Sequence, residues 1–425
     1  MEKSPVISII GGTIWGNRGA EAMLVTTIGG IREFSPEAHF NVFSYYPAKD
    51  CQLVADSSVT ILSGKPASLV TRHFLGALLA VIFKIIGLKI PGNSFFKIAR
   101  AFSDSDLLLD IGGITFSDGR EKYLPFNILS IWPAMLLNVP VVKMAQAVGP
   151  FEKPVNRTLA KIFLTRCEKI FARGDKTAEF LKLFNYPESK YDTVADIAFL
   201  YQSEYSLSSE NDQKITHHVS LIENVKKQGK QIIVFSPSIL VDQESKKRGL
   251  DYADRFLELI KTLGTQDFHY IFMPNATREG SDKSHNNDLL TLTRMREAYE
   301  ITQAQSPVGA GIEWVDYDIN TASVRRIISQ ADVLVTSRYH AMISGLSLGV
   351  PTVVIGWGHK YKETMAYFNL GEYSFDFGGE SMDLPAIILK ILGDAKGVRE
   401  KINVNLPEVK RLAQKQFDYL KRVLL

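Results

Sequence analysis

The chain has 425 residues, of which 45% are hydrophobic and 22% charged, and its formal net charge is +3. These values are typical of a globular protein and exclude a disordered chain, and so small a net charge gives no indication of a nucleic-acid partner. The length fits two domains of roughly 200 residues better than one core. The two cysteines, Cys51 and Cys167, are far apart, which argues against a disulfide scaffold or a zinc site and favours a reducing cytoplasm.

The first half of the chain alternates predicted strands and helices. Residues 6–10 (VISII) predict a buried strand and not a signal peptide, because the apolar run is short and little positive charge precedes it. A glycine-containing turn follows, but its spacing matches neither a dinucleotide fingerprint nor a P-loop. Further strands are predicted at 40–45, 107–111, 139–145 and 170–172, and helices at 19–34, 124–137, 156–168 and 176–184.

Residues 69–90 are the most hydrophobic stretch. Their uncharged part, 74–83, is ten residues long, short of the roughly 20 that span a bilayer. Two interpretations stay open. One is a buried helix, and the other is an interfacial helix over 72–90, with Arg72, Lys84 and Lys89 at the lipid headgroups, which would place a cytoplasmic protein at the inner face of the membrane.

The polar, poorly periodic residues 201–230 predict the boundary between a first domain (1–205) and a second (215–425). The alternation then restarts, which predicts an α/β fold of two Rossmann-like domains facing a cleft. In this half, strands are predicted at 232–235, 270–273, 312–315, 333–335 and 352–355, and helices at 252–263, 289–299, 321–329 and within the C-terminal 45 residues.

The stretch 331–361 carries the densest cluster of candidate site residues. Residues 337–340 (Ser-Arg-Tyr-His) lie where a predicted strand gives way to a helix, and open α/β sheets bind ligands at such strand ends. Backbone N–H groups at a helix start favour an anion, so Arg338 and His340 predict a negatively charged substrate. The next strand is followed by Trp357, His359 and Lys360, which would add cationic groups to the same crevice.

With these segments in order, the chain resembles the polysaccharide pyruvyl transferase family over most of its length. The resemblance implies a fold similar to the glycosyltransferase B type. It also implies a reaction in which phosphoenolpyruvate, without a cofactor or metal, donates its enolpyruvyl carbons to two sugar hydroxyls to form a pyruvate ketal. The residues that carry it are Gly16-Asn17-Arg18-Gly19, Asp110 to Gly113, Gln146 to Pro150, Ala172 to Asp175, Ala195 to Phe199, Ser337 to His340, Gly349 to Pro351, and Lys360.

The resemblance implies Arg338 and His340 as catalytic residues at the donor and Arg173 as a donor ligand. Guanidinium groups suit a carboxylate and a phosphate, and histidine suits proton transfer near neutral pH. Lys360 and the Gly112-Gly113 amides are predicted to hold phosphate or developing charge.

Gly16, Asn17 and Glu21 are predicted to bind the acceptor. Many family members have an acidic residue where this chain has Ala20, and Glu21 follows one position later.

The predicted acceptor is a sugar of a cell-surface or exopolysaccharide intermediate, and the sequence leaves open whether it is lipid-linked. Two other functions remain as alternatives. One is a glycosyltransferase of the same fold that uses a nucleotide sugar, and the other is a saccharide-binding subunit without activity.

Overall fold

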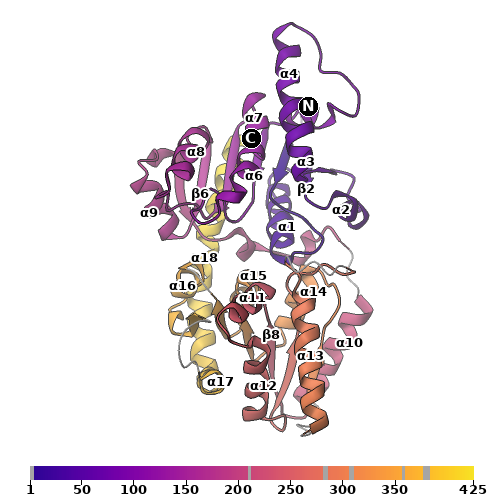
Figure 1. Ribbon diagram of the computed structural model, residues 1–425, viewed down its shortest axis with the longest axis vertical. Coiled ribbons are helices and arrows are strands. Elements are labelled where there is room, and N and C mark those ends of the chain that lie inside the picture. The colour runs from indigo at the N-terminus through magenta and orange to yellow at the C-terminus, as the bar shows by residue number, and fades with distance from the viewer. Residues whose placement is uncertain (1–3, 209–211, 281–285, 306–310, 357–358, 377–382) are drawn as a thin grey trace. The chain divides into compact units, whose positions relative to one another are not determined.

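The chain forms two compact units, and the computed structural model describes residues 4–208, 212–280, 286–305, 311–356, 359–376 and 383–425 (Figure 1). The first unit comprises residues up to 15, 20–208 and 410–425, and the second comprises 16–19 and 209–409. The break between 208 and 209 falls within the segment predicted as the boundary.

The C-terminal end differs from the predicted domain ranges, which gave the second domain everything from 215 to 425. Residues 410–425 belong to the first unit. Phe417 and Leu420 are buried, and the side-chain amide of Gln416 donates to the carbonyl of Ala195 at 3.2 Å. These contacts lie too far apart in sequence for periodicity to show them.

Within the described residues, the first unit contains a seven-stranded sheet with the order β3-β2-β1-β4-β5-β6-β7, and its paired strands are parallel. The chain order reverses between β1 and β4, which makes this the topological switch point. The strands β3 and β7 lay outside the predictions. The strands are β1 (Val6–Ile10), β2 (His39–Ser44), β3 (Val59–Ser63), β4 (Leu107–Asp110), β5 (Val141–Gln146), β6 (Lys169–Arg173) and β7 (Tyr191–Val194).

The helices of the first unit follow most predicted positions, but the helix predicted over 124–137 is two helices. Pro133 lies in the first turn of the second, and proline lacks the N–H that would continue the preceding helix. The helices are α1 (Arg18–Arg32), α2 (Pro47–Leu53), α3 (Pro66–Ser68), the π-helix η1 (Leu69–Phe74), α4 (Leu75–Ile85), α5 (Lys97–Ser103), α6 (Leu124–Leu129), α7 (Trp132–Leu136), α8 (Pro154–Leu164) and α9 (Asp175–Leu183).

Together α3, η1 and α4 form a continuous helical segment, Pro66–Ile85, that is long and apolar enough to cross a membrane by length and composition. About a third of its most apolar window is buried in the protein. In Figure 1, α4 extends away from the sheet of the first unit.

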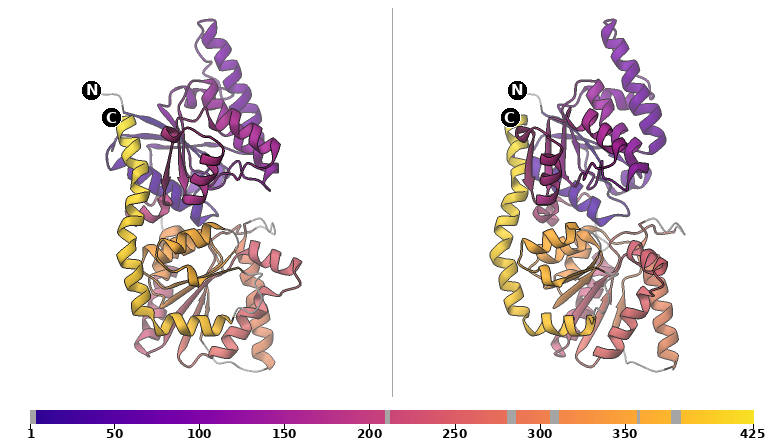
Figure 2. Two further views of the ribbon diagram at one scale, coloured as in Figure 1. Left: turned by 90° about the vertical axis from the view of Figure 1, so that its left-hand side faces the viewer. Right: turned by 60° about the vertical axis from the view of Figure 1, so that its left-hand side comes forward.

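The second unit contains, among its described residues, a six-stranded parallel sheet with the order β10-β9-β8-β11-β12-β13, and its switch point lies between β8 and β11. Helices cover both faces of this sheet (Figure 2). The strands are β8 (Gln231–Ser236), β9 (Phe268–Phe272), β10 (Ile312–Trp314), β11 (Val333–Thr336), β12 (Thr352–Gly356) and β13 (Ser374–Asp376).

The polar segment predicted as a linker contains a helix, α10 (Asp212–Lys227). Ile215, Val219 and Ile222 are buried at spacings of four and three residues, so a narrow apolar stripe is enough to dock it. The remaining helices are α11 (Ile239–Lys247), α12 (Tyr252–Leu263), α13 (Asp288–Gln305), α14 (Thr321–Ile328), α15 (Tyr339–Ser347), α16 (His359–Ala366), α17 (Leu384–Gly393) and α18 (Ala395–Leu424).

Candidate functional site

The turn that carries Arg338 lies at the switch point of the second sheet. The hydroxyl of Thr336 and the amide of Ser337 both donate to the carbonyl of Ser236, the last residue of β8, at 3.0 and 3.1 Å. The amide of Arg338 donates in turn to the Thr336 hydroxyl at 2.9 Å. The ends of β8 and β11 are therefore tied together where open α/β sheets bind ligands.

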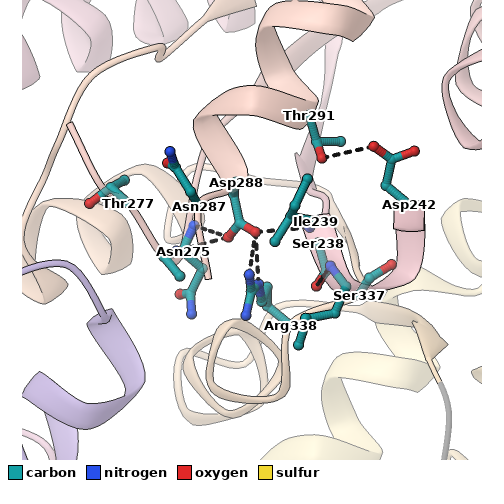
Figure 3. A network of polar contacts seen from close by, with 12 residues as sticks. Ser238, Ile239, Asp242, Asn275, Thr277, Asn287, Asp288, Thr291, Ser337 and Arg338 are labelled. Carbon is teal, nitrogen blue, oxygen red and sulfur yellow. Dashed lines mark hydrogen bonds and ion pairs between the residues drawn. The ribbon is translucent and has the colours of Figure 1, made fainter. Parts of the chain in front are cut away.

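Arg338 is held by a buried carboxylate, Asp288 (Figure 3). Its Nε donates to Asp288 Oδ1 at 3.1 Å, and its Nη2 bonds to the same oxygen. The Asp288 side chain is fully buried, whereas 12% of the Arg338 side chain is exposed. The Nη1 edge of the guanidinium takes no part in these bonds, so Arg338 is oriented but retains donors for an anion.

Asp288 also collects backbone amides from two loops. Its Oδ1 accepts from the amide of Ile239 at 3.0 Å, and its Oδ2 accepts from Asn275 at 3.2 Å and Ala276 at 2.8 Å. One carboxylate thus joins the loops after β8 and β9 to the arginine after β11. The sequence does not single out Asp288, because an aspartate at a helix start is usually only a cap and its partners are far away in the sequence.

A second polar group supports the same turn. The Tyr252 hydroxyl lies 2.5 Å from Ser337 Oγ, and burial raises the pKa of Tyr252 above its ordinary value, so the phenol stays neutral. Nearby, Asp242 accepts from Thr291 at 3.2 Å (Figure 3). Asp242 also forms an ion pair with Arg294. The loops around Arg338 are therefore fixed by several independent polar contacts.

His340 lies in the first turn of α15, two residues after Arg338, and is partly buried. The segment 337–340 is a turn that enters a helix, as the sequence predicts. A Cβ added at Gly19, which belongs to the second unit, would lie 2.2 Å from His340 Nδ1. Glycine at position 19 therefore leaves room for the imidazole ring of His340, and any side chain there would collide with it.

Lys360 joins this cluster through two tyrosines. Its Nζ lies 4.7 Å from the centroid of the Tyr339 ring and 5.2 Å from that of Tyr361, and the rings of Tyr339 and His340 are 5.3 Å apart. The Tyr361 hydroxyl donates to the carbonyl of Ser337 at 3.1 Å. The structure thus brings Arg338, His340 and Lys360 to one end of the second sheet. Trp357, predicted beside them, lies outside the described residues.

In the first unit, Arg173 and Gly113 lie together. Arg173 Nη2 donates to the carbonyl of Gly113 at 2.8 Å, and Nη1 pairs with Asp196 at 2.7 Å. Arg173 is buried, with 7% of its surface exposed. The arginine closing β6 is therefore anchored at the turn that follows β4, and its pairing with Asp196 was not predicted from the sequence.

Gly112 is fixed by the residue that ends β4. Its amide donates to Asp110 Oδ1 at 2.9 Å, and the other oxygen of Asp110 forms a buried ion pair with Lys143 on β5. Gly11, at φ +91°, places its backbone against Gly112, where an added Cβ would lie 2.4 Å from the Gly112 nitrogen. Backbone contact therefore fills the switch point of the first sheet.

The three predicted acceptor residues fall on both sides of a break between the two units. Gly16 and Asn17 belong to the second unit, where the amide of Thr277 donates to the Gly16 carbonyl at 3.0 Å. Glu21 belongs to the first unit and is 1% exposed, with Ser208 Oγ donating to it at 3.5 Å. The role of Glu21 at the acceptor stays a prediction, and its carboxylate is buried.

Comparisons with known proteins agree with the fold and with the family resemblance. A family model described as polysaccharide pyruvyl transferase matches residues 17–359. Among solved structures, the chain is similar to S. aureus MnaA with UDP, at 12% identity over 99% of this chain and 97% of that one, with a TM-score of 0.59. It is also similar to UDP-GlcNAc 2-epimerase from Neisseria meningitidis bound to UDP-GlcNAc, at 14% identity over 98% and 100% of the chains, with a TM-score of 0.53.

Anabaena HepE in complex with UDP is a third similar structure, at 12% identity over 97% of this chain and 95% of that one, with a TM-score of 0.55. At such low identities the likeness shows the fold alone. The predicted α/β class of the glycosyltransferase B type is confirmed.

Proposed function

The chain belongs to the polysaccharide pyruvyl transferase family, and from this premise we propose that it transfers the enolpyruvyl group of phosphoenolpyruvate to two hydroxyls of a saccharide. One hydroxyl adds to C2 of the donor while C3 gains a proton and becomes a methyl group. The C2–O bond to phosphate then breaks, and the second hydroxyl takes its place and loses its proton. The products are a cyclic pyruvate ketal and inorganic phosphate.

The oriented guanidinium of Arg338 carries the proposal. Phosphoenolpyruvate presents a carboxylate and a phosphate, and a planar guanidinium binds either of them through two parallel hydrogen bonds. Because Asp288 fixes one edge of Arg338, the Nη1 edge is preorganised for an anion at the end of β11. The start of α15 adds backbone amides at the same place.

We assign His340 to proton transfer. The reaction needs a proton delivered to C3 and protons removed from the attacking hydroxyls, and a histidine two residues from the donor arginine can serve one of these steps. Lys360, beside Tyr339, is the second cation proposed for the donor. In the first unit, the proposed donor residues are Arg173 and Gly113, because the Gly112 amide already donates to Asp110.

A nucleotide-sugar-dependent transferase remains the second candidate, because MnaA and HepE have been solved with UDP and share the fold. The fold hosts several chemistries, so this observation weighs less than the family match. A saccharide-binding subunit without activity is the third.

The experiment that separates these functions compares two donors. Thermal stabilisation of the purified protein would be measured with phosphoenolpyruvate and with UDP-GlcNAc, and phosphate release would be followed with a panel of cell-envelope glycan intermediates. The proposal predicts stabilisation by phosphoenolpyruvate and acceptor-dependent release of phosphate. Stabilisation by the nucleotide sugar alone would favour the second candidate, and glycan binding without phosphate release would favour the third.

A further inference from the structure

In the helical segment Pro66–Ile85, small residues face the protein and large apolar residues face outward, the opposite of what is expected for a surface helix. The residues that face the first unit include the small Gly76, Ala77 and Ala80, each buried. Large apolar side chains on the other face are exposed, as in Leu78 (41%) and Ile82 (47%). A helix in water normally turns its large apolar residues inward, so this outer face is suited to a less polar surrounding.

The exposed apolar surface is concentrated there. Among the described residues, nineteen large hydrophobic side chains are exposed, and eight of them fall between positions 70 and 88. Exposed apolar patches of this density usually mark a surface that binds another molecule or a membrane. We call this surface the apolar face, and its residues are Val70, Leu75, Leu78, Leu79, Ile82, Ile85, Ile86 and Leu88.

The stretch of chain that contains the apolar face carries charges of one sign. Residues 57–103 contain no aspartate or glutamate and six basic residues, a charge of +6, whereas the rest of the chain sums to −3 because the total is +3. Five of these basic side chains are exposed and the sixth is partly so. The six are Lys65, Arg72, Lys84, Lys89, Lys97 and Arg100.

Contacts between the helical segment and the rest of the first unit limit how the segment can meet a membrane. Leu69 and His73 are buried, and His73 Nε2 lies 2.7 Å from the carbonyl of Ser63 at the end of β3. The rings of Phe74 and Trp132 are 4.6 Å apart. A membrane-spanning orientation would break these contacts with the first unit, whereas an orientation parallel to the membrane surface keeps them.

We propose that the apolar face is a docking surface for an anionic phospholipid bilayer. The leucine and isoleucine side chains enter the boundary between headgroups and acyl chains, and the lysines and arginines contact the headgroup phosphates. A second copy of this chain fits less well, because a two-fold contact would bring a region without acidic residues against itself. The inference does not depend on which donor the enzyme uses.

The test is vesicle flotation of the full-length protein with phosphatidylcholine alone and with phosphatidylglycerol added. The wild type is expected to float with the anionic vesicles and to be released by salt. The double variant Leu78→Gln/Ile82→Gln should lose about tenfold or more in partitioning, as should Lys84→Glu/Lys89→Glu. The matched control is Ile162→Gln/Leu183→Gln, which removes exposed apolar side chains of α8 and α9 in the same unit and should float like the wild type.

Melting temperature, and stabilisation by phosphoenolpyruvate where the wild type shows it, verify that each variant is folded. Absence of the wild type from both vesicle fractions would overturn the proposal, as would flotation of the Leu78/Ile82 variant at the wild-type level. A concentration-dependent dimer that this variant abolishes, with no vesicle binding, would also overturn it and identify the face as a self-association surface.

Discussion

Replacing Asp288 by asparagine tests the network that orients Arg338. The substitution keeps the shape of the side chain but removes its charge and one acceptor oxygen. Both oxygens accept at least two hydrogen bonds, so either orientation of the amide places an NH2 group against N–H donors. Breaking a buried ion pair by removing one partner costs about 3–5 kcal/mol, and the full burial of Asp288 places it in that class.

Two assays follow from this magnitude. For a unit of this size, about 3–5 kcal/mol corresponds to a fall of roughly 10 °C in melting temperature. Hydrogen exchange in peptides from α11, whose first amide bonds Asp288, should speed up by about 100-fold or more if the loss is local.

The control is Asp316→Asn, because Asp316 pairs with Arg296 at the surface, with both side chains nearly half exposed. Such a pair contributes about 0–1 kcal/mol. If Asp288→Asn melts and exchanges like this control, the carboxylate does not hold the site and the reasoning is wrong.

His340→Ala is expected to abolish phosphate release while phosphoenolpyruvate still stabilises the protein; unchanged turnover would remove the proton-transfer role. Gly19→Ala should lower turnover severalfold or more, because the new methyl group would displace the His340 ring, whereas Gly393→Ala, with open space around it, should have no effect. A third prediction concerns pH. Burial lowers the pKa of His73 to about 4 from 6.5. Between these two pH values His73 is therefore protonated in the unfolded chain but neutral in the folded one. Stability is therefore complete above pH 6.5 and falls by about 3 kcal/mol towards pH 4, and His73→Gln should flatten this part of the unfolding profile measured in urea.

Periodicity and strand ends were enough to predict the class of fold and the position of Arg338. The strands β3, β7 and β13 were missed, and each has polar residues at partly or fully exposed positions, as in Val59–Ser63, where only Val59 and Leu62 are buried. Helix α10 was missed because few of its residues are apolar. In each case the sheet or the neighbouring helices supply the stabilisation, which local sequence does not show.

The supporting carboxylates were beyond sequence reasoning for a different reason. Asp288 precedes Arg338 by 50 residues and Asp196 follows Arg173 by 23 residues. Nothing in the local pattern links the members of either pair. Topology brings them together, because strands distant in the sequence end at the same edge of a parallel sheet.

The most direct test of the central claim is calorimetric titration of phosphoenolpyruvate into the wild type and into Arg338→Lys. Lysine keeps a positive charge near Asp288 but cannot present two parallel donors. The account predicts saturable binding to the wild type and an affinity at least tenfold weaker in the variant. Equal affinities, or no binding of phosphoenolpyruvate to a wild type that UDP-GlcNAc saturates, would contradict it.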